Sequence, residues 1–115
     1  MRKNKWIIEK QGREFVKFGG LLWLAHQMGL TSIVANPVIE DYEKFFFAFE
    51  ATATGVRKIN DKEHIVTFTD QGDASPKNVG KMIHPHLRRM ASTRAMARAL
   101  RLFTGCGITA FEEVH

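Results

Sequence analysis

Residues 44–56, with the sequence KFFFAFEATATGV, decide the fold of this chain. Two alternating sets of side chains run through the stretch. One set is entirely apolar and consists of Phe45, Phe47, Phe49, Ala51 and Ala53. The other set includes polar side chains and consists of Phe46, Ala48, Glu50, Thr52 and Thr54. Because successive residues of a strand point to opposite faces of its sheet, this alternation predicts a strand with one buried face.

The residues on both sides predict two more strands that pair with this one. Residues 59–62 have the composition of a hairpin turn, and residues 64–69 return as a strand. Before the central strand, residues 32–40 are also strand-like, with Pro37 favouring an edge or a bulge. The sequence therefore predicts a three-stranded antiparallel meander.

The N-terminal part of the chain predicts a hairpin followed by a helix. Residues 6–10 and 13–17 have the pattern of two short strands joined by a tight turn. Apolar side chains in residues 21–28 follow the 3.6-residue period of a helix, and Gly29 is placed to cap its end.

A long helix is expected after the meander. It begins near Pro85 or His86, because proline breaks a helix but is tolerated at its start, and it ends near Gly105. The predicted fold is α+β in the order β-β-α-β-β-β-α. In it the hairpin and the meander form one antiparallel sheet, and the long helix covers one face. The 115 residues suffice for a single domain with one core.

The phenylalanines of residues 44–56 have two interpretations. Aromatic side chains on a strand stack on unpaired bases in some nucleic-acid-binding domains, but in small domains they mostly fill the core. We therefore assign them to the core rather than to a base-stacking platform. Phe47 and Phe49 are expected to lie against Leu100 and Phe103.

Composition narrows the class of protein. The single cysteine, Cys106, cannot form an internal disulfide, and His84 and His86 do not supply the ligands of a zinc site. No apolar run is long enough to span a bilayer, and the basic residues 1–5 are not followed by the apolar segment of a signal peptide. We expect a cytoplasmic protein without membrane contact, metal or cofactor.

Few residues suggest catalysis. Residues 72–81 contain glycines and lysines but not the GxxxxGK[ST] spacing of a nucleoside triphosphatase. A set of carboxylates from Glu50, Asp70 and Asp73 could hold a metal beside a lysine, which leaves a metal-dependent nucleic-acid-processing enzyme as an alternative. Nothing in their spacing requires such a site, so we expect no catalytic residues.

The positive charge is concentrated towards the C-terminus. The formal net charge is +5, and no acidic residue occurs between Asp73 and Glu112. The basic residues within that window are Lys77, Lys81, Arg88, Arg89, Arg94, Arg98 and Arg101. A polyanion is the natural partner of such a field.

Three of these arginines form a stripe on the predicted long helix. At about 100° per residue, Arg94, Arg98 and Arg101 fall within about a sixth of the helix circumference. The opposite side is apolar and consists of Ala95, Met96, Ala99, Leu100, Leu102 and Phe103. Without acidic neighbours on the helix, the stripe favours an exposed cationic face. The alternative is that the arginines pair with carboxylates from elsewhere in the fold.

Two motifs resemble a known family. FGGLLWLAHQMGL at residues 18–30 and AMARALRLFTG at residues 95–105, together with the order of elements, are similar to the Rad-fifty-two-type single-strand annealing proteins. In that family a strand pair leads into a glycine-preceded helix, a meander and a long helix that ends in an RALR-x-F-G motif. The run STRAMARAL at residues 92–100 also resembles the long helix of phage essential-recombination-function proteins.

The resemblance implies a non-catalytic function. Arg98 and Arg101 match basic long-helix residues that contact the nucleic-acid backbone in the family. The family implies binding of single-stranded DNA, ATP-independent strand annealing in recombination or repair, and a homo-oligomer such as a ring or filament. The expected nucleic-acid-binding residues are Arg94, Arg98, Arg101, Arg88, Arg89, Lys77 and Lys81. A further alternative is an interaction protein whose basic helix docks an acidic partner.

Overall fold

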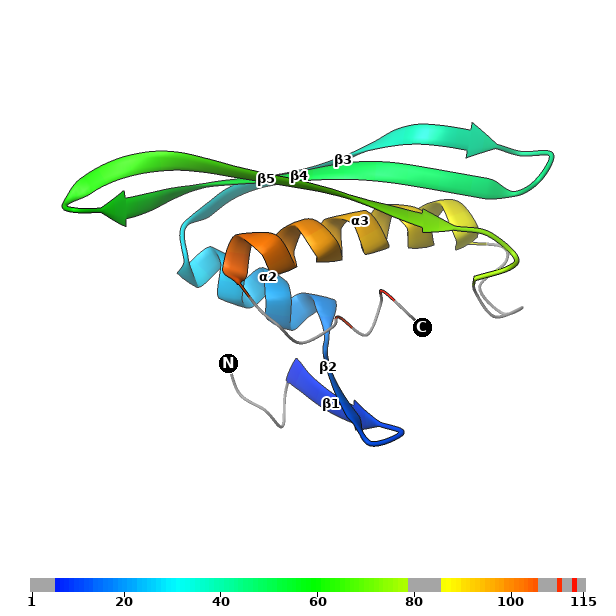
Figure 1. Ribbon diagram of the computed structural model, residues 1–115, viewed down its shortest axis with the longest axis horizontal. Coiled ribbons are helices and arrows are strands. Elements are labelled where there is room, and N and C mark those ends of the chain that lie inside the picture. The colour runs from blue at the N-terminus through cyan, green and yellow to red at the C-terminus, as the bar shows by residue number, and fades with distance from the viewer. Residues whose placement is uncertain (1–5, 79–85, 106–109, 111–112, 114–115) are drawn as a thin grey trace.

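The computed structural model describes residues 6–78, 86–105, 110 and 113. These residues form β1 (Ile7–Lys10), β2 (Arg13–Val16), α2 (Phe18–Gln27), β3 (Leu30–Asp41), β4 (Phe46–Ile59), β5 (Lys62–Ala74) and α3 (Leu87–Thr104). The fold is α+β, and the order β-β-α-β-β-β-α agrees with the prediction. In Figure 1 the long meander lies above α3, and α2 lies below that helix.

The predicted meander is present as a three-stranded sheet in the order β3-β4-β5. β4 and β5 pair continuously from Ile59 opposite Lys62 to Phe47 opposite Ala74. β5 therefore runs past its predicted end, because its last residues continue to pair with β4. As a result the end of β5 lies beside the loop between β3 and β4, residues 42–45, at the right of Figure 1.

β3 is an edge strand whose pairing with β4 is irregular. The register shifts between Leu30 and Ser32, and again between Pro37 and Ile39. Because proline has no backbone N–H to donate, an edge strand with a local register shift tolerates it. The predicted edge or bulge at Pro37 is confirmed.

α3 covers one face of the meander. The buried face of β4 includes Phe47, Phe49, Ala51 and Ala53, which alternate as predicted. These residues belong to one buried cluster with Leu100 and Phe103. Within the cluster, the Phe103 ring packs edge-on against Phe68 with centroids 6.0 Å apart. The Arg88 guanidinium lies 5.1 Å from the centroid of the Phe49 ring. The prediction that Phe47 and Phe49 belong to the core is confirmed.

β5 and α3 approach each other closely at Gly72. A Cβ atom at this position would lie 2.3 Å from the backbone nitrogen of Ala95 and 2.8 Å from Cβ of Arg94. Because the nearest of these atoms is backbone of the helix, a side chain at residue 72 would push the helix away from the sheet. The contact brings the end of β5 directly over the turn of α3 that carries Arg94.

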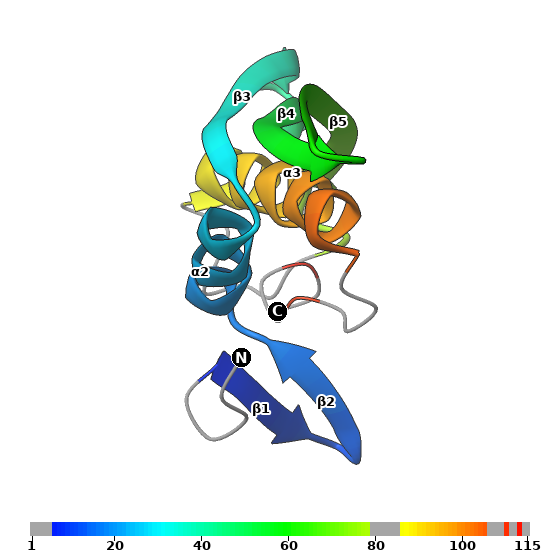
Figure 2. The same cartoon turned by 90° about the vertical axis from the view of Figure 1, so that its left-hand side faces the viewer.

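β1 and β2 form a separate two-stranded sheet, so the prediction that the hairpin joins the meander was wrong. Figure 2 shows the two helices between the hairpin and the meander. Only Lys17 separates β2 from α2, and α2 places Leu21 and Ala25 in the core. The hairpin is therefore held on the far side of the helices. Val16 makes an isolated parallel bridge with Ala110 instead.

No helix or strand among the described residues covers the second face of the meander (Figure 1). Thr52 of β4 stands opposite Thr69 of β5, and their hydroxyl oxygens are 3.1 Å apart. The next cross-strand pair on this face is Glu50 opposite Gln71. Because the middle of this face carries neutral and acidic side chains, it does not attract phosphates.

Candidate functional site

Arg94 is buried, so the prediction that it belongs to an exposed cationic stripe was wrong. The residue is 4% exposed. Its Nη1 donates to the carbonyl of Asp73 at 2.9 Å and to Oδ1 of Asn78 at 3.0 Å, and its Nη2 donates to the carbonyl of Asn78 at 3.1 Å. Burial lowers the pKa of Arg94, and the charge of Arg98 acts in the same direction. The close approach at Gly72 explains the burial, because it leaves the end of β5 over this turn of α3.

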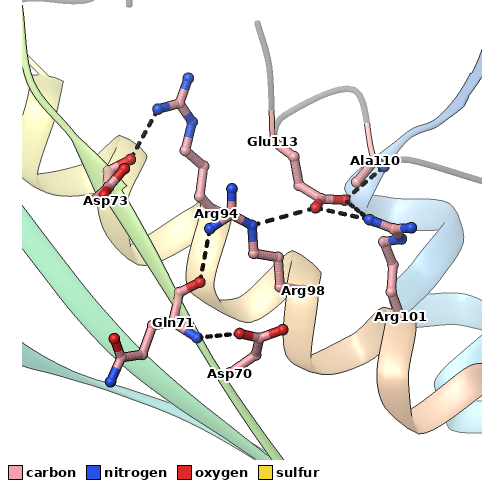
Figure 3. Close-up of polar contacts among 8 residues, drawn as sticks. All are labelled: Asp70, Gln71, Asp73, Arg94, Arg98, Arg101, Ala110 and Glu113. Carbon is pink, nitrogen blue, oxygen red and sulfur yellow. Dashed lines mark hydrogen bonds and ion pairs between the residues drawn. The ribbon is translucent and has the colours of Figure 1, made fainter. Parts of the chain in front are cut away.

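Arg98 and Arg101 remain partly exposed but share the carboxylate of Glu113, as Figure 3 shows. Arg101 Nη1 lies 2.9 Å from Glu113 Oε1, and Arg98 Nε lies 3.5 Å from the same oxygen. Arg98 also donates from Nη1 to the carbonyl of Gln71 at 2.9 Å. The side chain of Glu113 is 5% exposed, and its Oε2 accepts a hydrogen bond from the backbone nitrogen of Ala110 at 2.8 Å.

The arginines of the stripe therefore pair with other groups of the fold, which is the alternative to an exposed cationic face. Glu113 lies just beyond the acid-free window, and the chain returns it to α3. The helical wheel was also wrong about Leu102, which is 48% exposed although it was placed on the apolar side. Ala97 is fully buried. The burial of Ala97 arises because α3 is covered by the meander and also contacts α2, so the buried arc of this helix is wider than one face.

Arg88 and Arg89 lie at the opposite end of α3, and Lys77 lies in the turn after β5. Arg88 forms an ion pair with Glu40, and the hydrogen bond to this carboxylate raises the pKa of Arg88. Arg89 and Lys77 are exposed, and neither forms an ion pair with another residue that the structure describes. Lys81 lies outside the described residues, as do Cys106 and His84.

Two pockets lie at this end of the molecule. The first, of about 390 Å³, is lined by His86, Arg88, Arg89 and Ser92. The second, of about 380 Å³, is lined by Lys44, Phe46, Ser75, Pro76 and Lys77. The loop of residues 42–45, the turn after β5 and the start of α3 meet here (Figure 1). We call this region the basic end and define it by Lys44, Lys77, Arg88 and Arg89, with His86 beside them.

The turn after β5 is fixed by an internal network. The backbone nitrogen of Ser75 donates to Oδ1 of Asn78 at 2.9 Å, and the backbone nitrogen of Asn78 donates to the carbonyl of Ser75 at 3.1 Å. Asn78 Nδ2 donates to Asp73 Oδ1 at 3.1 Å. Arg94 bonds the same Asn78 from below, so α3 holds the turn that carries Lys77.

The loop between β3 and β4 carries exposed aromatic side chains. Asp41 Oδ1 accepts hydrogen bonds from the backbone nitrogens of Glu43 and Lys44, both at 3.0 Å. Phe45 follows with φ of 53° and is 53% exposed, so it does not belong to the core as the alternation predicted. Tyr42 is 64% exposed and packs edge-on against Phe47 with ring centroids 5.2 Å apart.

Sequence reasoning missed Lys44 and Phe46. Lys44 lies outside the acid-free window, and Phe46 belongs to an aromatic run that was assigned to the core as a whole. The available signal was the period-two pattern itself, which places Phe46 on the face opposite Phe47. The neighbouring position of residues 44–46 and 74–77 depends on the register of β4 with β5, which the sequence did not provide.

The carboxylates considered for a metal site do not converge. In the pairing of β4 with β5, Glu50 stands opposite Gln71 and Asp70 stands opposite Ala51. Because adjacent positions of a strand point to opposite faces, Glu50 and Asp70 project to different sides of the sheet. Among the described residues there is no group of three candidate metal ligands.

Comparisons with known proteins do not identify a family: no protein-family model and no curated protein matches the chain. Within residues 6–78 and 86–105, neither helix has the length and apolar character needed to cross a membrane.

Proposed function

We propose that this protein binds single-stranded DNA through the basic end and promotes annealing of complementary strands without ATP. The observation that carries the proposal is that Lys44 and Lys77 line one pocket and Arg89 lines another, and that all three are exposed and form no ion pair with another described residue. The resemblance to Rad-fifty-two-type annealing proteins supports the same function, and the order of elements is the one that the resemblance implies.

The proposed mechanism is electrostatic. Lysine and arginine side chains neutralise phosphates and release counterions, and this term supplies most of the affinity of sequence-independent binding. A strand held at the basic end has its phosphates neutralised and its bases unpaired, so a complementary strand can test its register. Such a step requires positioning and charge neutralisation rather than nucleotide hydrolysis. Copies of the chain arranged as a homo-oligomer would extend the binding path beyond one basic end.

The arginine stripe has a secondary part in this proposal. Arg94 is buried and its guanidinium is hydrogen-bonded within the fold. Arg98 and Arg101 are partly neutralised by Glu113. Phosphates are therefore expected to contact the basic end first. Arg98 and Arg101 contribute only to the extent that a phosphate displaces the carboxylate of Glu113.

The test is a titration of a labelled single-stranded oligonucleotide and its duplex at several salt concentrations. We expect tighter binding of the single strand and a log–log salt slope that becomes shallower by about 0.7 when Lys44, Lys77 or Arg89 is replaced by alanine. Lys58→Ala serves as a matched control, because Lys58 is also exposed but lies at the other end of β4.

Annealing is measured separately with two complementary labelled strands in the absence of ATP. The wild-type protein should accelerate pairing, and the Lys44→Ala Lys77→Ala double variant should not. Two results would contradict the proposal: binding that does not depend on salt, or binding of an acidic polypeptide as tightly as an oligonucleotide. The second result would identify a protein-docking surface instead. Light scattering with and without oligonucleotide tests the homo-oligomer.

A further inference from the structure

The pocket between Lys44 and Lys77 has an apolar interior and a cationic rim. Phe46 and Pro76 supply its apolar surface, and most of the pocket lining is apolar. Its volume of about 380 Å³ is within the range of small-molecule sites, about 300–1,000 Å³. Both lysines are exposed, so their ammonium groups remain hydrated while the pocket interior does not offer water many partners.

The pocket is built from two segments that the fold holds in place. Asp41 stands opposite Phe46 at the end of the β3–β4 pairing, and the side chain of Asp41 accepts two backbone hydrogen bonds from the loop that carries Lys44. On the other side, Asn78 fixes the turn that carries Pro76 and Lys77. Because both walls are fixed by hydrogen bonds, the ligand does not have to order them on binding.

The chemistry of the pocket selects its occupant. An apolar slot beside an aromatic ring accommodates a flat ring system, and the two lysines that line it, one from each segment, favour a ligand that carries negative charge next to that ring. A nucleotide within a single strand has this arrangement, with a base between two phosphates. In a duplex the faces of the base are covered by its stacked neighbours, so the slot accepts only an unpaired base.

We propose that this pocket binds one unpaired base of a single strand, which stacks on Phe46 beside Pro76, while Lys44 and Lys77 neutralise the adjacent phosphates. The proposal rests on the proposed function and adds to it a site that recognises the base and not only the backbone. It predicts that base and backbone contribute separately to affinity, through different residues.

The test compares Phe46→Leu with Phe46→Tyr. Leucine retains apolar bulk but has no ring, whereas tyrosine retains the ring. The probe is a labelled oligothymidylate, and the matched control is an oligonucleotide of equal length whose central nucleosides are abasic. We expect Phe46→Leu to weaken oligothymidylate binding about tenfold, with an unchanged salt slope. Phe46→Tyr should bind as the wild type does, and the abasic oligonucleotide should bind Phe46→Leu and wild type equally. Circular dichroism melting verifies that both variants are folded.

The outcomes separate this inference from the proposed function. If wild type binds oligothymidylate and Phe46→Leu binds it equally well, the base pocket is overturned and backbone binding stands. If wild type does not bind single strands, both fall. Free thymidine monophosphate bound as tightly as the oligonucleotide would overturn a site within a strand. A parallel titration with oligouridylate identifies whether DNA or RNA supplies the preferred base.

Discussion

Arg94 donates two hydrogen bonds to Asn78, one to the side-chain oxygen at 3.0 Å and one to the carbonyl at 3.1 Å. Through this pair the middle of α3 holds the turn after β5, which carries Pro76 and Lys77. Arg94, which the sequence predicted to contact phosphates, is therefore buried and holds this turn. Its guanidinium holds the turn from inside the fold and is almost closed to solvent.

Replacing Arg94 by alanine should destabilise the protein. The substitution removes a nearly buried guanidinium together with its hydrogen bonds to the carbonyls of Asp73 and Asn78, and hydrogen bonds to charged groups contribute about 1.5–3 kcal/mol. We expect a loss of about 2 kcal/mol or more in the free energy of unfolding, measured by urea denaturation. Arg94→Lys should recover part of it, because lysine keeps the charge but not the forked geometry.

The affinity for single strands distinguishes a role of Arg94 in holding the turn from a direct contact of Arg94 with phosphate. We expect the Arg94→Ala variant, measured where it is still folded, to bind single strands more weakly than wild type. Its salt slope should be unchanged, because the turn moves but the exposed charges remain. A variant of wild-type stability whose slope is shallower by about 0.7 would instead identify Arg94 as a phosphate contact.

Gly72→Ala should disturb the same region by another route. The added Cβ would lie 2.3 Å from the backbone nitrogen of Ala95, a separation that neither β5 nor α3 can accommodate without moving. Overpacking of this kind costs about 1–3 kcal/mol, which thermal melting can resolve. Gln71→Ala, at the exposed neighbouring position, is the matched control and should change stability by less than about 0.5 kcal/mol. Equal melting temperatures for the two variants would contradict the close approach.

Arg101→Ala and Arg89→Ala should separate structural from binding arginines. Arg101 bonds both carboxylate oxygens of Glu113, at 2.9 and 3.1 Å, and its loss leaves that nearly buried carboxylate with the backbone nitrogen of Ala110 and the longer contact to Arg98. Arg101→Ala should therefore lower stability by about 1–3 kcal/mol with little change in salt slope. Arg89→Ala should leave stability unchanged and make the slope shallower by about 0.7. If Arg101→Ala instead made the slope shallower and Arg89→Ala lowered stability, the binding surface would be the arginine stripe.

The structural features that depend on the local spacing of residues within a strand or at a helix end were predicted well. The alternation in residues 44–56 predicted which side chains of β4 are buried, since a period of two defines the faces of a strand wherever it pairs. Gly29, with φ of 97°, ends α2 as the sequence predicted. The order of elements followed from such patterns, whereas the position of the β1–β2 hairpin did not. It depends on how α2 packs against α3, which spacing does not specify.

The candidate site was predicted less well because its charges are balanced over long separations in the sequence. A helical wheel shows neighbours on one helix, but Glu113 reaches Arg98 and Arg101 from beyond the helix end, and Glu40 reaches Arg88 from β3. The basic residues that form no ion pair with another described residue can be identified only once these pairings are known. An acid-free window in the sequence is therefore weak evidence for an exposed cationic surface.

Glu113→Gln tests whether Arg98 and Arg101 can bind single-stranded DNA once the carboxylate of Glu113 no longer neutralises them. Glutamine keeps an oxygen for the backbone nitrogen of Ala110 but removes the charge that holds Arg98 and Arg101, whose side chains are 39% and 28% exposed. We expect tighter binding of single strands and a salt slope that is steeper by about 0.7 for each arginine that reaches a phosphate.

The control for this release is Glu63→Gln, which makes the same change in net charge at an exposed position of β5, far along the strand from the basic end. If both variants steepen the slope equally, the gain reflects net charge alone. If only Glu113→Gln does so, the two arginines lie on the path of the strand and Glu113 limits their contribution. An unchanged slope in Glu113→Gln, with a folded protein, would mean that the path runs over the basic end without reaching α3 at residues 98–101.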